Sequence, residues 1–129
     1  MLLRAIFKQP NPLGSWRSIN VSVSSELIRV ECLRTIDRVT LAARLEENEA
    51  ASRRASAMEL LYGVNIVPLD RSILGRAAEP FPTSLGTLDA IHLSTALLVQ
   101  EDFEDLVFAT HDRALGIAAR AMGFQVEGI

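Results

Sequence analysis

Three acidic residues, far apart along the chain, occupy positions where a carboxylate can take part in chemistry. Asp89 lies in the first turn of an apolar, helix-forming stretch, 87–99. Asp112 follows a strand-like run together with Thr110, and Glu31 lies in an otherwise apolar helical stretch near the start of the chain. Acids so placed predict a shared pocket.

Carboxylates that share a pocket predict a bound cation. Like charges a few ångströms apart raise one another's pKa, so three carboxylates cannot all stay ionised without a counter-charge. A hard divalent cation such as Mg²⁺ or Mn²⁺ supplies that charge and prefers oxygen ligands. Such an ion can orient and deprotonate water and stabilise a leaving oxygen, which is the chemistry of phosphodiester hydrolysis.

Each acid also has an ordinary structural interpretation. Asp89 can complement the positive end of its helix dipole, which contributes about 0.3 to 1 kcal/mol. Glu31 can form an (i, i+3) pair with Arg34, which is worth about 0.2 to 0.5 kcal/mol. If these interpretations hold, the chain is a generic α/β domain whose acids lie far apart.

Other reaction classes lack their residues in this sequence. There is no glycine-rich phosphate loop with a lysine, and Lys8 is the single lysine. The two histidines do not follow zinc-ligand spacing and have no cysteine partner. A Gly-x-Ser-x-Gly motif for a serine nucleophile is absent. A metal-dependent hydrolase is therefore the enzyme class that the residue types favour.

Length and composition indicate one folded domain, residues 1–129. Of the 129 residues 49% are hydrophobic and 22% charged, which is typical of a globular protein. The net charge of −3 argues against a generally basic surface, although it allows a local one. The single cysteine permits no internal disulfide and fits a reducing cytoplasm. No apolar run approaches the roughly twenty residues that a membrane span needs.

Alternating strands and helices predict a three-layer α/β/α domain with a mostly parallel sheet. Residues Ser24 and Ser25, Asp70 and Thr87 are predicted to cap the helices that follow them. Ligands collect at the carboxyl ends of parallel strands, so the three acids can face one crevice there. The predicted strands are 19–23, 64–69, 106–109 and 124–126, and the predicted helices are 2–8, 26–43, 46–62, 71–78, 87–99 and 112–122.

Four blocks of sequence, in order, resemble the PIN-domain ribonucleases of the VapC toxin type. The similarity runs from about Ser24 to Phe124, and each block alone is a weak signal. The blocks read SSELIRVECLR from Ser24, LDAIHL from Leu88, ATHDRAL from Ala109 and AARAMGF from Ala118. Four blocks in register make a strong signal.

The resemblance implies a Mg²⁺- or Mn²⁺-dependent endoribonuclease that acts on structured RNA. It also implies a VapB-like antitoxin that plugs the acidic pocket, and a homodimer. By position, Glu31, Asp89 and Asp112 would be three of the family's four acids, which hold the metal and carry catalysis, with Thr110 as a polar supporter of the site. His111 and Arg113 could contact RNA or antitoxin, or simply provide exposed loop charge.

The start of the sequence departs from the family's pattern. Family members begin with a central strand ending in Leu-Asp-Thr/Ser, which supplies the first metal-binding aspartate. Here residues 1–7 resemble the helix that follows that strand. Either the given chain begins too late, or the protein lacks the strand and its ligand. In the second case we expect poor turnover, and the alternative function is a catalytically impaired PIN-like module that only associates with antitoxin or with itself.

Overall fold

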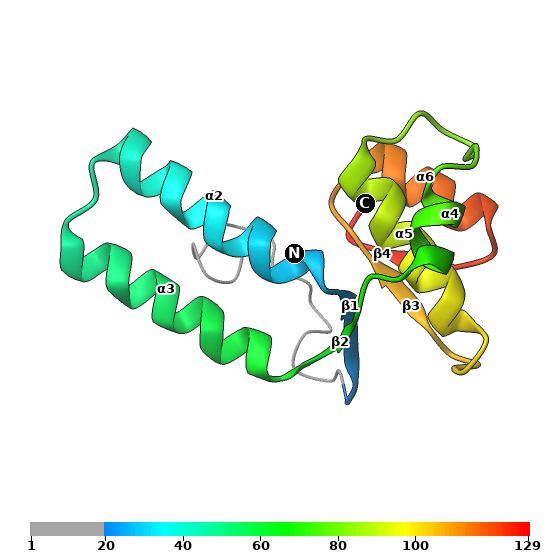
Figure 1. Cartoon of the computed structure of the whole chain (residues 1–129), viewed down its shortest axis with the longest axis horizontal. Helices are drawn as coiled ribbons and strands as arrows, with labels where there is room; N and C mark the ends of the chain where they lie inside the picture. Colours follow the sequence, from blue (N-terminus) through cyan, green and yellow to red (C-terminus); the bar gives the residue numbers. More distant parts are fainter. Residues whose placement is uncertain (1–19) are drawn as a thin grey trace. The chain divides into compact units, whose positions relative to one another are not determined.

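The computed structural model describes residues 20–129, which form two compact units (Figure 1). The first unit covers residues 20–66 and the second covers Val67–Ile129. The predicted helix 2–8 and the first part of the predicted strand 19–23 lie outside the described residues. Each unit is described by itself below.

The first unit is a pair of long helices joined to a pair of short strands. Its elements are β1 (Ser22–Ser25), α2 (Leu27–Ala43), α3 (Glu47–Tyr62) and β2 (Val64–Val67), the last of which ends at the boundary with the second unit. Helices α2 and α3 lie side by side and β1 pairs with β2 (Figure 1). The hydroxyl of Ser22 on β1 donates to the carbonyl of Gly63, the residue before β2, at 3.0 Å.

The two helices are held together by a small apolar core and one surface ion pair. Arg54 on α3 lies 3.0 Å from Asp37 on α2, and both side chains are about half exposed, so this pair is worth at most about 1 kcal/mol. Burial of the apolar side chains stabilises the helix pair more than this ion pair does, since each Å² of buried apolar surface contributes roughly 25 cal/mol. The buried core residues of this unit are Cys32, Ile36, Ala57 and Leu61.

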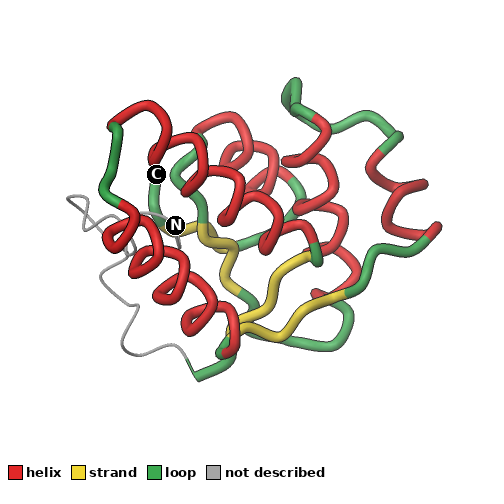
Figure 2. Tube along the Cα trace, turned by 60° about the vertical axis from the view of Figure 1, so that its left-hand side comes forward, coloured by secondary structure: helices red, strands yellow, loops and turns green. Residues whose placement is uncertain are grey.

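The second unit packs three helices with a two-stranded parallel sheet. Its elements are α4 (Arg71–Ala77), α5 (Thr87–Gln100), β3 (Val107–Ala109), α6 (Arg113–Ala121) and β4 (Gln125–Glu127). Strands β3 and β4 pair in parallel with Phe108 opposite Val126, and α6 is the connection between them. Figure 2 shows the helices and strands of the chain by colour. The βαβ unit at the end of the chain follows the predicted α/β pattern.

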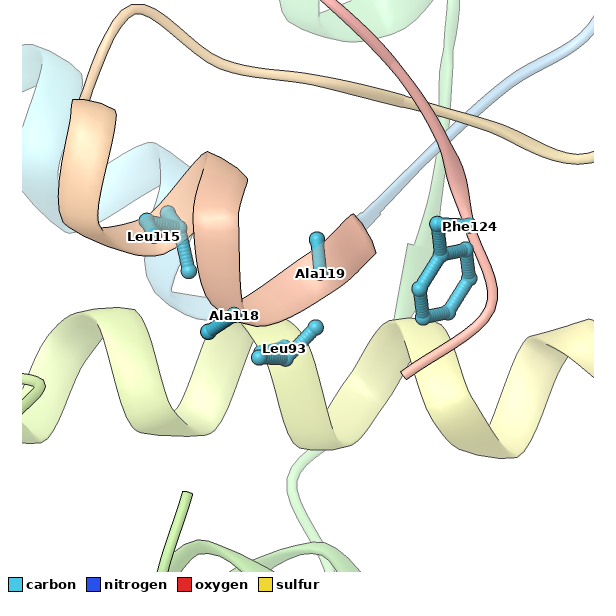
Figure 3. Packing of buried hydrophobic residues seen from close by; sticks show 5 residues of the cluster. All are labelled: Leu93, Leu115, Ala118, Ala119 and Phe124. Atoms are coloured by element: carbon cyan, nitrogen blue, oxygen red, sulfur yellow. The ribbon is translucent and has the colours of Figure 1, made fainter. Parts of the chain in front are cut away.

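Helix α5 supplies the centre of the core of the second unit. Leu93 is fully buried and faces α6, where Ala118 and Ala119 are also fully buried (Figure 3). Small alanine side chains allow the two helices to approach closely. Leu115 and Phe124 complete the buried cluster, and the Phe124 ring lies 5.6 Å from that of Phe108 on β3. As predicted, α5 is buried over most of its circumference.

Two of the predicted helix caps are wrong and one is confirmed. Ser24 and the buried Ser25 are strand residues of β1, and α2 begins after Glu26 with no side-chain cap. Helix α5 begins after Gly86, whose extended backbone takes the capping position, so Thr87 is already inside the helix. The Asp70 carboxylate accepts from the Ile73 N–H at 2.8 Å and caps α4 as predicted. Serine and threonine favour caps, but strand pairing and backbone conformation decide which residue takes that position.

The remaining helix and strand predictions are confirmed to within a few residues at each end, and with them the α/β class. In the described part of the chain, no helix has the length and apolar composition that crossing a membrane requires.

Candidate active site

Thr110 and Asp112 form a compact turn between β3 and α6. The buried Thr110 donates its backbone N–H to the Glu127 carbonyl at 3.0 Å, which continues the pairing of β3 with β4 by one residue. Its hydroxyl oxygen accepts from the Asp112 N–H at 3.0 Å. The parallel sheet therefore fixes the threonine, and the threonine fixes the backbone of the acid.

Asp112 has two roles available because a carboxylate has two oxygens. Its Oδ1 accepts from the Leu115 N–H at 2.8 Å and caps α6. Within residues 20–129 its Oδ2 makes no hydrogen bond. The side chain is exposed, so this second oxygen can accept from a solvent molecule or bind a cation. Helix capping and metal binding are compatible at this residue.

The segment after β4 packs closely against the same turn. Gly128 has φ +102°, and a side chain there would collide with the carbonyl of Thr110. Ile129 lies against Gly116 on α6, where a Cβ would meet the isoleucine side chain. Sequence reasoning did not find these two glycines, because only the tertiary contact shows what each one makes room for.

Asp89 lies in the first turn of α5, where the sequence predicts it, and is half-buried. Its Oδ2 lies 4.0 Å from the position that a Cβ on Gly86 would take, so the glycine leaves space beside the carboxylate. The loop before α5 is tied to α6, since the Thr83 hydroxyl donates to the Ala114 carbonyl at 2.8 Å. This bond joins a residue just before α5 to the first turn of the helix that Asp112 caps.

Glu31 lies on α2 in the first unit and is half-buried beside Cys32. Burial, and after it the negative charge of Glu31, raises the pKa of the Cys32 thiol to about 11. The cysteine is therefore protonated at neutral pH and behaves as the small buried hydrophobe that the sequence predicts.

Within neither described unit do three side chains of His, Cys, Asp or Glu come together in a group that could hold a metal ion. The structure thus brings Thr110 and Asp112 together, and it places Asp89 and Glu31 on separate helices. Convergence of the three acids on one ion stays a prediction. The donors themselves, carboxylate and hydroxyl oxygens, are of the kind that fits Mg²⁺ or Mn²⁺.

Comparison with known proteins gives a family relationship. The family model of the PIN domain matches residues 1–120. The chain is 32% identical to Ribonuclease VapC47 of Mycobacterium tuberculosis over 103 residues, which are 80% of this chain and 68% of that protein. It is also 32% identical to Ribonuclease VapC46 of the same species over 110 residues, which are 85% of this chain and 75% of that protein. No solved structure matches the chain significantly.

Proposed function

The chain belongs to the PIN-domain family as a VapC-type member, and from this premise we propose that it is the endoribonuclease toxin of a VapBC-type toxin–antitoxin pair. The proposed reaction is hydrolysis of an RNA phosphodiester bond that depends on Mg²⁺ or Mn²⁺. The names of both relatives support the ribonuclease class. The observation that carries the site assignment is the Thr110–Asp112 turn, which presents a carboxylate oxygen with no hydrogen bond among the described residues.

Each predicted site residue has a proposed role. Asp89 and Asp112 would hold the metal, and Glu31 would bind it directly or through water. When bound, the ion would activate water and stabilise the leaving oxygen. Thr110 positions the backbone of Asp112 through its hydroxyl and does not need to touch the substrate. Asp112 would offer its second oxygen to the ion, because the first accepts from the Leu115 N–H.

The proposed partners follow from the VapC type. The substrate is RNA, and a VapB-like antitoxin would inhibit the protein by occupying the acidic pocket. We also propose a homodimer that acts in the cytoplasm.

The central test replaces Asp89 by asparagine, which keeps the size and shape of the side chain and removes its charge. The D89N variant should lose RNA cleavage and cellular toxicity and keep the far-UV circular dichroism spectrum of the wild type. The control variant D102N removes the charge of an exposed acid just after α5 and should cleave normally. EDTA should abolish cleavage by the wild type, and added Mg²⁺ should restore it. Unchanged cleavage by D89N would overturn the assignment.

The alternative function is a catalytically impaired PIN-like binding module that only associates with antitoxin or with itself. The alternative predicts no RNA products and no thermal shift when Mg²⁺ or Mn²⁺ is added to the pure protein. Products that appear with Mg²⁺ and disappear in D89N would exclude it.

A further inference from the structure

The second unit carries an open pocket of about 400 Å³ beside the candidate active site. We call it the α6 pocket, and it is lined by His111, Arg113, Ile117, Arg120 and Ile129. Three of these residues lie on α6 at positions i, i+4 and i+7, so they share one face of the helix. The α6 pocket therefore combines two guanidinium groups with the side chains of two isoleucines.

The two arginines of the α6 pocket have uncommitted hydrogen-bond donors. Both are exposed, and in the part of the chain that the structure describes neither forms an ion pair or a side-chain hydrogen bond. Other arginines are engaged: Arg54 pairs with an aspartate, and Arg76 stacks over the Phe81 ring at 4.3 Å. Exposed guanidinium groups on one helix face, without acidic partners, attract an anion.

Contacts within the second unit hold one wall of the α6 pocket, formed by His111 and Ile129, in place. The Nδ1–H of His111 donates to the Gly128 carbonyl at 2.6 Å, which ties the turn after β3 to the segment after β4. The Nε2 atom of the same ring is buried with no hydrogen-bond partner among the described residues. Ile129 can lie against α6 because Gly116 has no side chain to occupy that space. The position of the wall is therefore set by the same contacts that support Thr110.

We propose that the α6 pocket binds backbone phosphates of the RNA substrate next to the bond that is cleaved, an inference that rests on the proposed function. His111 and Arg113 flank Asp112 in sequence, so the α6 pocket adjoins the acid that must meet the RNA backbone. Arginine binds phosphate bidentately. Seven helical residues rise about 10.5 Å, so Arg113 and Arg120 can contact different phosphates while Ile117 contacts the sugar or base between them.

The charge of the whole chain favours this assignment. A chain of net charge −3 repels a polyanion, so it needs a local cationic site to hold RNA. An acidic protein segment is the competing occupant. RNA is favoured because the α6 pocket borders the Thr110–Asp112 turn, which the substrate backbone must approach for hydrolysis.

Binding is tested without cleavage. The probe is a fluorescein-labelled single-stranded RNA oligonucleotide in EDTA, and its anisotropy is followed across a range of salt concentrations. The double variant R113Q/R120Q should bind at least about tenfold more weakly. The slope of log K against log salt should become shallower by about 1.4, because two phosphate contacts are lost. The control R71Q removes an exposed arginine of α4 outside the α6 pocket and should leave both quantities unchanged.

The cleavage assay separates this proposal from the proposed function. With Mg²⁺ present, the double variant should raise KM and keep kcat within a few fold. If R113Q/R120Q bound RNA as the wild type does and had the same KM, the proposed role of the α6 pocket would be overturned, and the proposed nuclease function would still stand. Binding of a poly-glutamate peptide that is lost in R113Q/R120Q, with RNA binding retained, would also overturn it. If the wild type cleaves no RNA, the proposed function fails, but the binding measurement in EDTA still tests the pocket.

Discussion

The two oxygens of Asp112 allow its structural role to be separated from its chemical role. Its Oδ1 caps α6 by accepting from the Leu115 N–H at 2.8 Å. Asparagine caps a helix about as well as aspartate, whereas alanine loses the bond at a cost of about 1 kcal/mol. For a chain of this size that corresponds to about 4 °C in Tm. D112A should therefore lower Tm by that amount, and D112N should leave it nearly unchanged.

Cleavage should respond differently from stability. Both D112N and D112A should lose RNA cleavage by on the order of 100-fold or more, the scale of removing a group that stabilises developing charge. Asp70 is a matched control because its Oδ1 caps α4 in the same way, accepting from the Ile73 N–H at 2.8 Å. D70A should lose about 1 kcal/mol of stability and keep the wild-type rate per folded molecule.

The measurements are urea unfolding followed by circular dichroism, and initial rates of RNA cleavage with Mg²⁺. Wild-type cleavage by D112N would refute a chemical role for the carboxylate. If D70A lost as much cleavage as D112A, the effect of D112A would be explained by lost stability, and the reasoning from two oxygens would fail.

Three further predictions concern the fold. L93A should destabilise the protein by about 2 to 5 kcal/mol in urea unfolding, because Leu93 is fully buried where α5 packs on α6. G128A should cost more stability than G123A in the same assay: both glycines have positive φ, but only a side chain at Gly128 collides with backbone. The raised pKa of Cys32, about 11, makes the folded state keep a proton that the unfolded state releases above about pH 9. The free energy of unfolding should therefore fall from about pH 9 to pH 11, and in C32A this part of the fall should be absent.

Local sequence patterns were enough to predict most of the secondary structure. Amphipathic spacing and glycine or aspartate at the ends predicted the long helices to within one or two residues at each end, as at α3, which ends at Tyr62 just before Gly63. The caps at Ser25 and Thr87 were predicted wrongly, because hydrogen bonding between strands and the backbone angles of Gly86 override the preference of a single side chain. The family was also evident from sequence, because its blocks keep their order along the chain.

By itself the sequence predicted which residues could carry chemistry: the acids Glu31, Asp89 and Asp112, with Thr110 beside the last of them. Residue type suffices for such a prediction because carboxylate oxygens are ligands that Mg²⁺ and Mn²⁺ prefer. Only the tertiary structure decided that the Glu127 carbonyl holds the backbone of Thr110 and that the segment after β4 builds the wall of the α6 pocket. Those contacts depend on pairing and packing between residues distant in sequence, which no local pattern records.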